Sequence, residues 1–309
     1  MCDSDATNMI INLLDYHSRF IEIASIETNQ IINRDNDDKN KLSKGIDYAI
    51  KKNVLQNSDN KHNNKINNKI DVYGKTPDDI ADEIISKINN ISSNNVIIIH
   101  GLSGTGKGTV AKTLQKKIND TNNSSNTIIW SNGNIFRTIT LLAITQCEQQ
   151  HITFSEDFLT CENINNIMKC LSFVKNNYTY DIYINGFGIN SFMNDIQNTL
   201  LKSSYISKYV PTIAYHTQGE VINFTNNVIS TIISLDVNSK CNIIIEGREE
   251  TMNYIHTDHR FELLLSNSEL IGKRRLAQKM IPLLQRNIHG NDISIDDLLE
   301  ILEVIAKTQ

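Results

Sequence analysis

The residues best suited to chemistry lie in one short run, Gly101–Thr109, which reads Gly-Leu-Ser-Gly-Thr-Gly-Lys-Gly-Thr. The run follows an apolar stretch, Val96–Ile99, and precedes a helical pattern. Strand, glycine-rich loop and helix in this order are what a phosphate-binding P-loop requires. The glycines let backbone N–H groups point at phosphate oxygens, and the start of the helix adds the positive end of its dipole. Lys107 would bridge the β- and γ-phosphates of ATP.

Chance is a poor explanation of this run, because the chain has only 13 glycines in 309 residues and such a pattern would arise about 10⁻⁵ times at that composition. Gly108, rather than Ser or Thr, follows Lys107, so the usual hydroxyl ligand for Mg²⁺ is displaced to Thr109. We therefore expect ATP together with Mg²⁺. The expected ATP-binding residues are Gly101, Ser103, Gly104, Thr105, Gly106, Lys107, Gly108 and Thr109.

Two arginines stand just beyond predicted strands. Arg137 comes shortly after a strand that ends at Trp130, and Arg248 follows a wholly apolar strand and Glu246-Gly247. The carboxyl ends of parallel strands face the ligand crevice, and an arginine there can hold two phosphate oxygens at once. Glu246 would hold a water of Mg²⁺ or orient Arg248. These positions suit a second phosphate site, and phosphoryl transfer depends mainly on positioning and electrostatics.

With these motifs in order, the sequence resembles the cytidylate kinase family. The glycine loop is similar to that family's GPSGAGKGT, and the resemblance covers roughly residues 95–302. The other matching segments are 131–137, similar to DSGAIYR; 246–249, similar to DGRD; 216–221, similar to RTQEV with one inserted residue; and the pair Arg274-Arg275 after a strand and a turn.

The resemblance implies a P-loop NTPase-type parallel sheet with helices on both faces and an inserted subdomain that binds a nucleoside monophosphate. It implies ATP-dependent phosphorylation of CMP, dCMP or UMP, with Lys107 and Arg248 as catalytic residues. The acceptor-binding residues it implies are Asn132, Arg137, His216, Gln218, Arg248 and Glu249. Arg274 and Arg275 would border a lid, and Thr109 and Glu246 would contact the metal, the latter through water.

The departures from the family pattern leave other functions open. Asn132 replaces a Ser and His216 replaces an Arg, and the RDxxDxxR segment that the family carries past its lid is missing from the C-terminal region, although residues 293–300 look like the helix leading to it. One alternative is a nucleotide-binding domain without turnover that serves as a scaffold or regulator. Another is an adenylylsulfate kinase, whose loop is also similar, although GKGT and the Gly-Arg at 247–248 argue against it.

The elements that must position these residues can be read from hydrophobic patterning. Short β-branched runs separated by helical segments predict a parallel sheet covered on both faces. The predicted strands are 95–100, 127–130, 241–246 and 260–265, and residues 178–185 predict a hairpin. Thr76-Pro77-Asp78-Asp79 predicts the start of a helix that reaches about residue 90.

We divide the chain into three parts. Residues 1–56 form a helical region of unknown role, with helices expected near 9–32 and 42–55; residues 57–72 form a polar linker; and residues 73–309 form the kinase-like domain, with an acceptor-binding insertion at about 150–225. Residues 1–90 carry no motif, and a protein partner for them stays open.

Composition excludes several classes of function. The net charge of −5 gives no global attraction to nucleic acid or to anionic membranes. No apolar run approaches the ~20 residues that a membrane helix needs, and the acidic N-terminus lacks a signal-peptide pattern. The 5 cysteines are odd in number and form no CxxC pair, which favours a reduced compartment. We expect a cytoplasmic protein whose partners are ATP and a nucleoside monophosphate, with no nucleic acid and no membrane.

Overall fold

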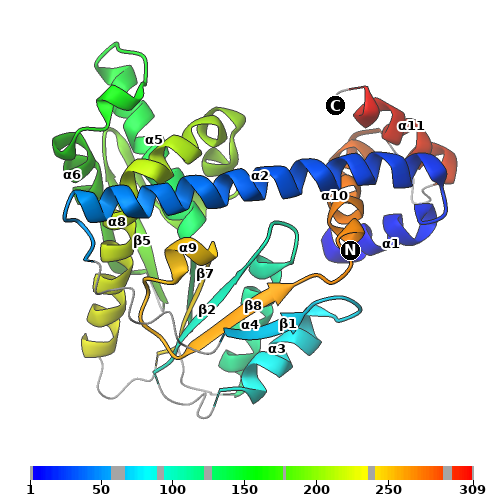
Figure 1. Cartoon of the computed structure of the whole chain (residues 1–309), viewed down its shortest axis with the longest axis horizontal. Coiled ribbons are helices and arrows are strands. Elements are labelled where there is room, and N and C mark those ends of the chain that lie inside the picture. The colour runs from blue at the N-terminus through cyan, green and yellow to red at the C-terminus, as the bar shows by residue number, and fades with distance from the viewer. Residues whose placement is uncertain are drawn as a thin grey trace.

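A five-stranded parallel sheet, in the order β1-β8-β2-β7-β3, lies at the centre of the protein (Figure 1). The structure is a computed structural model that describes residues 3–56, 67–88, 94–121, 127–176, 179–235, 241–287 and 294–307. The strands are β1 (Asn67–Asp71), β2 (Val96–Gly101), β3 (Ile128–Ser131), β7 (Ile243–Gly247) and β8 (His259–Leu264). The four strands predicted from sequence are confirmed, with bounds shifted by one or two residues.

Helices cover both faces of this sheet because side chains on a strand alternate between its faces. Ile97 and Ile99 of β2 pack with α3 (Pro77–Ser86) and α4 (Lys107–Thr121). Ile98, between them, faces the opposite layer, which contains α5 (Asn132–Gln149) and α8 (Ser204–Leu235). Mixed α/β architecture with a parallel sheet between two helical layers is thereby confirmed.

An antiparallel sheet is inserted between α5 and α8. Its strands are β4 (Leu171–Asn176), β5 (Thr179–Gly186) and β6 (Ile189–Phe192), accompanied by α6 (Cys161–Lys169) and α7 (Met193–Ile196). Two short 3₁₀ turns, Glu156–Phe158 and Leu200–Lys202, flank the insertion.

The expectation that residues 178–185 form a whole hairpin was wrong. From residue 179 onward this range is the single strand β5, and residue 178 lies outside the described residues. Its alternating Ile182 and Ile184 are both buried, which places them on one face of one strand. The hairpin partners are the flanking strands β4 and β6.

The N-terminal helices differ from the expected pair at 9–32 and 42–55. Helix α1 (Asp3–Leu14) ends early, and α2 (Ser18–Lys51) then runs without a break for 34 residues. Residues 33–41 are strongly polar, which interrupted the hydrophobic pattern in the sequence. The helix nevertheless continues through them, because Asp35 is buried against charged and polar partners rather than apolar ones.

Part of the expected linker, 57–72, is also structured. Residues 57–66 lie outside the described residues, but 67–71 form β1, which pairs with β8 at the edge of the sheet. Ile70 and Val72 are buried there. Two apolar residues among asparagines and lysines are a weak sequence signal for a strand. The segment is a strand because it pairs with β8. Beyond β1, α3 begins at Pro77, as predicted, and ends at Ser86 rather than near residue 90. A capping box between Thr76 and Asp79 stabilises its start.

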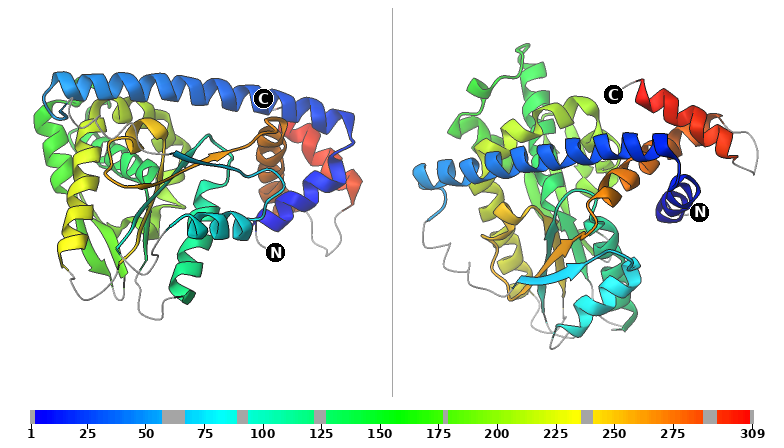
Figure 2. Two further views of the ribbon diagram at one scale, coloured as in Figure 1. Left: turned by 60° about the horizontal axis from the view of Figure 1, so that its bottom comes forward. Right: turned by 45° about the vertical axis from the view of Figure 1, so that its right-hand side comes forward.

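The helix α2 crosses the whole molecule and packs at one end on α10 (Glu269–Asn287) and at the other on α8 (Figures 1 and 2). Its first half shares an apolar cluster with α1, α10 and α11 (Ile295–Ala306). A one-turn helix, α9 (Glu249–Met252), lies beneath its middle. Among the described helices, none combines the length and apolarity needed to cross a bilayer.

Candidate active site

The glycine loop (Gly101–Thr109) joins the carboxyl end of β2 to the start of α4. Gly104 and Gly106 have φ angles of 81° and 83°, a region in which other residues are strained. Helix α4 begins at Lys107, and the first N–H groups of a helix have no partner within it. The loop therefore presents backbone donors and a helix dipole at one point, which is an arrangement that attracts anions.

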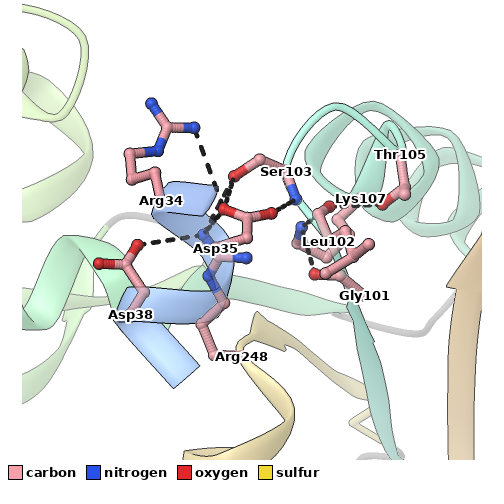
Figure 3. Close-up of polar contacts among 9 residues, drawn as sticks. All are labelled: Arg34, Asp35, Asp38, Gly101, Leu102, Ser103, Thr105, Lys107 and Arg248. Atoms are coloured by element: carbon pink, nitrogen blue, oxygen red, sulfur yellow. Dashed lines mark hydrogen bonds and ion pairs between the residues drawn. The ribbon is translucent and has the colours of Figure 1, made fainter. Parts of the chain in front are cut away.

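The ammonium group of Lys107 folds back on the loop (Figure 3). It donates to the carbonyl oxygens of Gly101, at 2.9 Å, and Leu102, at 2.7 Å. Burial and the nearby positive charge of Arg248 lower the pKa of Lys107 to about 8, while Glu246 and Asp35 act in the opposite direction. A phosphate at the loop would supply the negative charge that this buried cation lacks.

Strand β7 brings Glu246 beside the start of α4. A Cβ atom built on Gly108 would lie 3.4 Å from Oε2 of Glu246, an ordinary contact distance, so this carboxylate lies next to the loop. Thr109 is exposed in the first turn of the same helix. These two side chains are oxygen donors of the kind that Mg²⁺ prefers. Ser131 of β3 lies opposite Glu246 in register, so Asn132 follows at the same edge of the sheet.

A residue that the sequence did not single out, Asp35 of α2, connects two parts of the site (Figure 3). Its Oδ2 accepts a hydrogen bond from the backbone N–H of Ser103 at 2.6 Å, and its Oδ1 accepts one from the Ser103 hydroxyl at 2.8 Å. Oδ1 also accepts from Nη2 of Arg248 at 2.7 Å. Asp38, one turn further on, lies 3.4 Å from the same nitrogen. The glycine loop and Arg248 are thus joined through the N-terminal helix.

Charges in this group stabilise one another. Burial would raise the pKa of Asp35, but hydrogen bonds from Arg248 and Ser103 outweigh it and lower that pKa. Burial would likewise lower the pKa of Arg248, and the hydrogen bond and charge of Asp35 raise it instead. Asp38, which has weaker partners, has its pKa raised by burial. Asp35 and Arg248 are therefore an ionised pair at neutral pH.

The signal that could have revealed Asp35 is present in the sequence. Arg34, Asp35, Asp38 and Lys41 have the spacing of RDxxDxxR, with Lys in the last place. That pattern is missing from the C-terminal region, whereas the fold brings this N-terminal spacing to the glycine loop. Arg34 lies 4.0 Å from the Asp35 carboxylate.

A cavity of about 490 Å³ lies beside the glycine loop, between α2 and the carboxyl ends of β2 and β8. Asp35, Leu102, Arg248 and Glu249 line it, together with Leu265 and other residues at the end of β8. Its volume is within the range of small-molecule sites. Of the expected site residues, Gly101, Thr105, Arg248 and Glu249 line this cavity.

Two expected acceptor-binding residues, Asn132 and Gln218, are buried, and only the oxygen of each side-chain amide has a hydrogen-bond partner. The amide oxygen of Asn132 accepts from Trp130 Nε1 at 3.1 Å, and that of Gln218 accepts from the Thr251 hydroxyl at 2.9 Å. Their amide nitrogens, Asn132 Nδ2 and Gln218 Nε2, have no hydrogen-bond partner among the residues that the structure describes. Buried donors without a partner are rare in proteins, and a ligand that accepts hydrogen bonds would satisfy them.

Arg137 and His216 are placed differently from what the sequence suggested. Arg137 donates to the carbonyl of Leu201 at 3.0 Å and to the hydroxyl of Ser207 at 2.9 Å, so it holds the insertion onto α5. Burial lowers its pKa. The ring of His216 packs edge-on against Tyr48 and Tyr215, and burial lowers its pKa. No contact of either side chain with the glycine loop or Arg248 is found among the described residues.

Arg274 and Arg275 lie on α10, which packs against α2. Arg274 is partly buried, and burial lowers its pKa; Arg275 is exposed. Ile271, one turn earlier, lines the cavity. Neither Arg274 nor Arg275 is among the described residues that line the cavity.

A scan of protein-family models and a search of curated proteins found no match to this chain. Its function therefore has to be argued from the residues and their geometry.

Proposed function

We propose that the protein transfers the γ-phosphate of ATP to a pyrimidine nucleoside monophosphate, with CMP, dCMP or UMP as the acceptor. One observation carries the proposal. The glycine loop with Lys107 at a helix start lies beside Glu246 and Arg248, which follow the neighbouring strand of a parallel sheet. A phosphate-binding loop next to a second cationic site is what a transfer between two nucleotides needs.

The donor nucleotide would bind at the glycine loop, in a P-loop arrangement. The N–H groups at the start of α4 and the ammonium of Lys107 would hold its phosphates, replacing the internal hydrogen bonds that Lys107 now makes. The adjoining cavity of about 490 Å³ offers room for the nucleoside.

The acceptor would bind between Arg248 and the inserted sheet. Arg248 would hold its phosphate, and the unpartnered amide nitrogens of Asn132 and Gln218 would donate to oxygen or nitrogen acceptors on its base or sugar. Arg137 would contribute by fixing the insertion rather than by touching the phosphate, because its hydrogen bonds go to Leu201 and Ser207.

The reaction itself needs little covalent chemistry from the protein. An oxygen of the acceptor phosphate attacks the γ-phosphorus of ATP, the bond from that phosphorus to the β-bridging oxygen breaks, and ADP leaves with the electron pair. Arg248 and Lys107 would neutralise charge on the transferring group, and the surrounding helices would exclude water.

The donor set near the loop fits Mg²⁺, which usually binds through one or two carboxylates together with water and substrate phosphates. Glu246 and Thr109 would be the protein contacts. No group of three or more His, Cys, Asp or Glu side chains that could hold a metal occurs in the described ranges, so the nucleotide would have to supply the remaining ligands. When bound, the ion would withdraw charge from the β- and γ-phosphate oxygens.

The proposal is tested by mixing the purified chain and MgATP with CMP, dCMP, UMP or AMP separately, and measuring ADP release. A pyrimidine acceptor should support turnover, and Arg248→Ala should reduce it by at least ~10-fold, since a transition-state arginine contributes several kcal/mol. Arg286→Ala, an exposed arginine of α10, is the matched control and should behave like the parent. ADP release that no acceptor stimulates would refute the proposal.

One observation favours a second candidate, a nucleotide-binding domain without turnover. In the structure, Asp35 neutralises Arg248 and bonds to Ser103, so the cation meant for a phosphate already has a carboxylate partner. That candidate predicts ATP binding that depends on Lys107, with no product from any acceptor.

A further inference from the structure

We propose that Asp35 is a positioning residue that couples the donor and acceptor sites, by fixing Arg248 to the glycine loop. The inference rests on the proposed function, because it assigns the donor phosphates to the loop and the acceptor phosphate to Arg248. In this role Asp35 would hold Arg248 and Ser103 in place rather than bind a phosphate.

The hydrogen bonds of Asp35 span two neighbouring strands. Ser103 belongs to the loop after β2, and Arg248 follows β7. The side chain of Asp35 is 2% exposed, and its two oxygens both accept from Ser103. Nη2 of Arg248 also donates to the Ser103 hydroxyl at 3.0 Å. The three side chains therefore form a closed set of contacts, in which moving one displaces the other two.

Helix α2 is held on both sides of Asp35, so the carboxylate cannot easily withdraw. On one side, a Cβ on Gly272 of α10 would fall 1.8 Å from the carbonyl oxygen of Ala24. On the other side, a Cβ on Gly45 would fall 2.8 Å from the carbonyl oxygen of Tyr215 in α8. At both crossings the glycine lets the two helix backbones approach closely. This packing favours an Asp35 that stays in place when nucleotides bind.

The pairing leaves part of Arg248 for a ligand. A guanidinium group has five N–H donors. Within the described residues, Arg248 makes its hydrogen bonds through Nη2 alone, to Asp35, Asp38 and Ser103. Its Nε and Nη1 remain for an acceptor phosphate, held in the direction that Asp35 imposes. A donor phosphate that orders Ser103 would therefore also order Arg248, and by linkage the acceptor would tighten donor binding equally.

The test measures this coupling in the full chain. Calorimetry gives the dissociation constant of AMP-PNP, a non-hydrolysable ATP analogue, with Mg²⁺ in the presence and absence of saturating CMP. The parent protein should bind AMP-PNP at least ~5-fold more tightly with CMP present. In Asp35→Asn the ratio should fall to about 1, and Asp35→Glu should restore part of it. Asp37→Asn, the same change two residues along on an exposed position of α2, should keep the parental ratio.

A parental ratio of 1, or an Asp35→Asn ratio equal to that of the parent, would overturn the inference. Thermal unfolding of each variant shows whether it is folded. If Asp35→Asn does not fold, Ser103→Ala is measured in its place, because it removes only the hydroxyl that bonds both Asp35 and Arg248. Ser103→Ala should lower the affinity ratio, and an unchanged ratio would contradict the inference. If the parent shows this coupling between AMP-PNP and CMP but no phosphate transfer, the proposed function is refuted and the positioning role of Asp35 stands.

Discussion

Lys107 would hold the donor phosphates through its partly buried ammonium group, which lies near the cation of Arg248 and the carboxylates of Glu246 and Asp35. Replacing it with alanine should weaken AMP-PNP binding by about 10- to 150-fold, which corresponds to the ~1.5–3 kcal/mol of a hydrogen bond to a charged group. Calorimetry checks this. Lys112→Ala, an exposed lysine on the same helix, is the control and should bind like the parent. Equal affinity in Lys107→Ala would show that the nucleotide does not bind at the loop.

The same side chain predicts a pH dependence. Its pKa in the nucleotide-free chain is lowered to about 8, so the neutral amine predominates above pH 8. Binding phosphates requires the ammonium form, and the affinity for AMP-PNP should therefore fall as pH rises from 8 to 10, by up to about tenfold per unit. In Lys107→Arg the group stays charged over this range, so the fall should disappear. A fall of the same size in both proteins would assign it to another group.

The residues of the site divide by how far their contacts reach along the chain. Gly104, Gly106 and Lys107 could be predicted because a short loop between a strand and a helix is encoded locally. Asp35 could not, because its partners Ser103 and Arg248 lie 68 and 213 residues away, and only the path of α2 brings them together. A charged residue on a helix normally faces solvent, and the RDxxDxxR-like spacing from Arg34 to Lys41 does not by itself show which residues Asp35 contacts.

At the scale of the elements, the start of α3 is set by a local signal that can be tested alone. The Thr76 hydroxyl accepts from the Asp79 N–H, and the Asp79 carboxylate accepts from the Thr76 N–H. Thr76→Ala should destabilise the protein by about 1 kcal/mol. Urea unfolding measures this, and Thr231→Ala, at an exposed threonine near the end of α8, should be close to neutral. Equal midpoints for parent and Thr76→Ala would mean that the cap contributes nothing.

The crossing of α2 and α10 has no room for a side chain at Gly272. An added methyl group would also lie 2.3 Å from the Thr28 hydroxyl, in addition to its clash with the α2 backbone. Gly272→Ala should force the helices apart and cost about 1–3 kcal/mol or more. The urea midpoint should drop accordingly, while Gln278→Ala, exposed on the same helix, should leave it unchanged. A Gly272→Ala protein as stable as the parent would contradict the close packing.

The elements themselves were predictable where the signal was a continuous apolar run, as in β2 and β7. They were missed where tertiary contacts overrode composition. Strand β1 sits among asparagines and lysines and depends on β8 for its pairing, and α2 continues through a polar stretch that reads as a break between helices.

At the scale of the whole molecule, the N-terminal helices pack against the rest of the chain. Phe20 and Ile23 share an apolar cluster with Leu276 and Met280 of α10, and Ala49 packs in another cluster with Ile222 of α8. A chain lacking residues 1–56 would expose both surfaces and leave Arg248 without Asp35. It should show no cooperative thermal unfolding, as followed by circular dichroism. A truncated chain that unfolds cooperatively at the parental midpoint would show that the remaining residues fold without residues 1–56.

If the protein is a pyrimidine monophosphate kinase, phosphate passes from a nucleotide at the glycine loop to the pyrimidine monophosphate. The most direct measurement is transfer of radiolabel from [γ-³²P]ATP to CMP, with the products separated by chromatography. The parent and Lys112→Ala should produce labelled CDP, and Lys107→Ala should produce none above background. Label that appears only as inorganic phosphate, or that stays in ATP while AMP-PNP still binds, would contradict it.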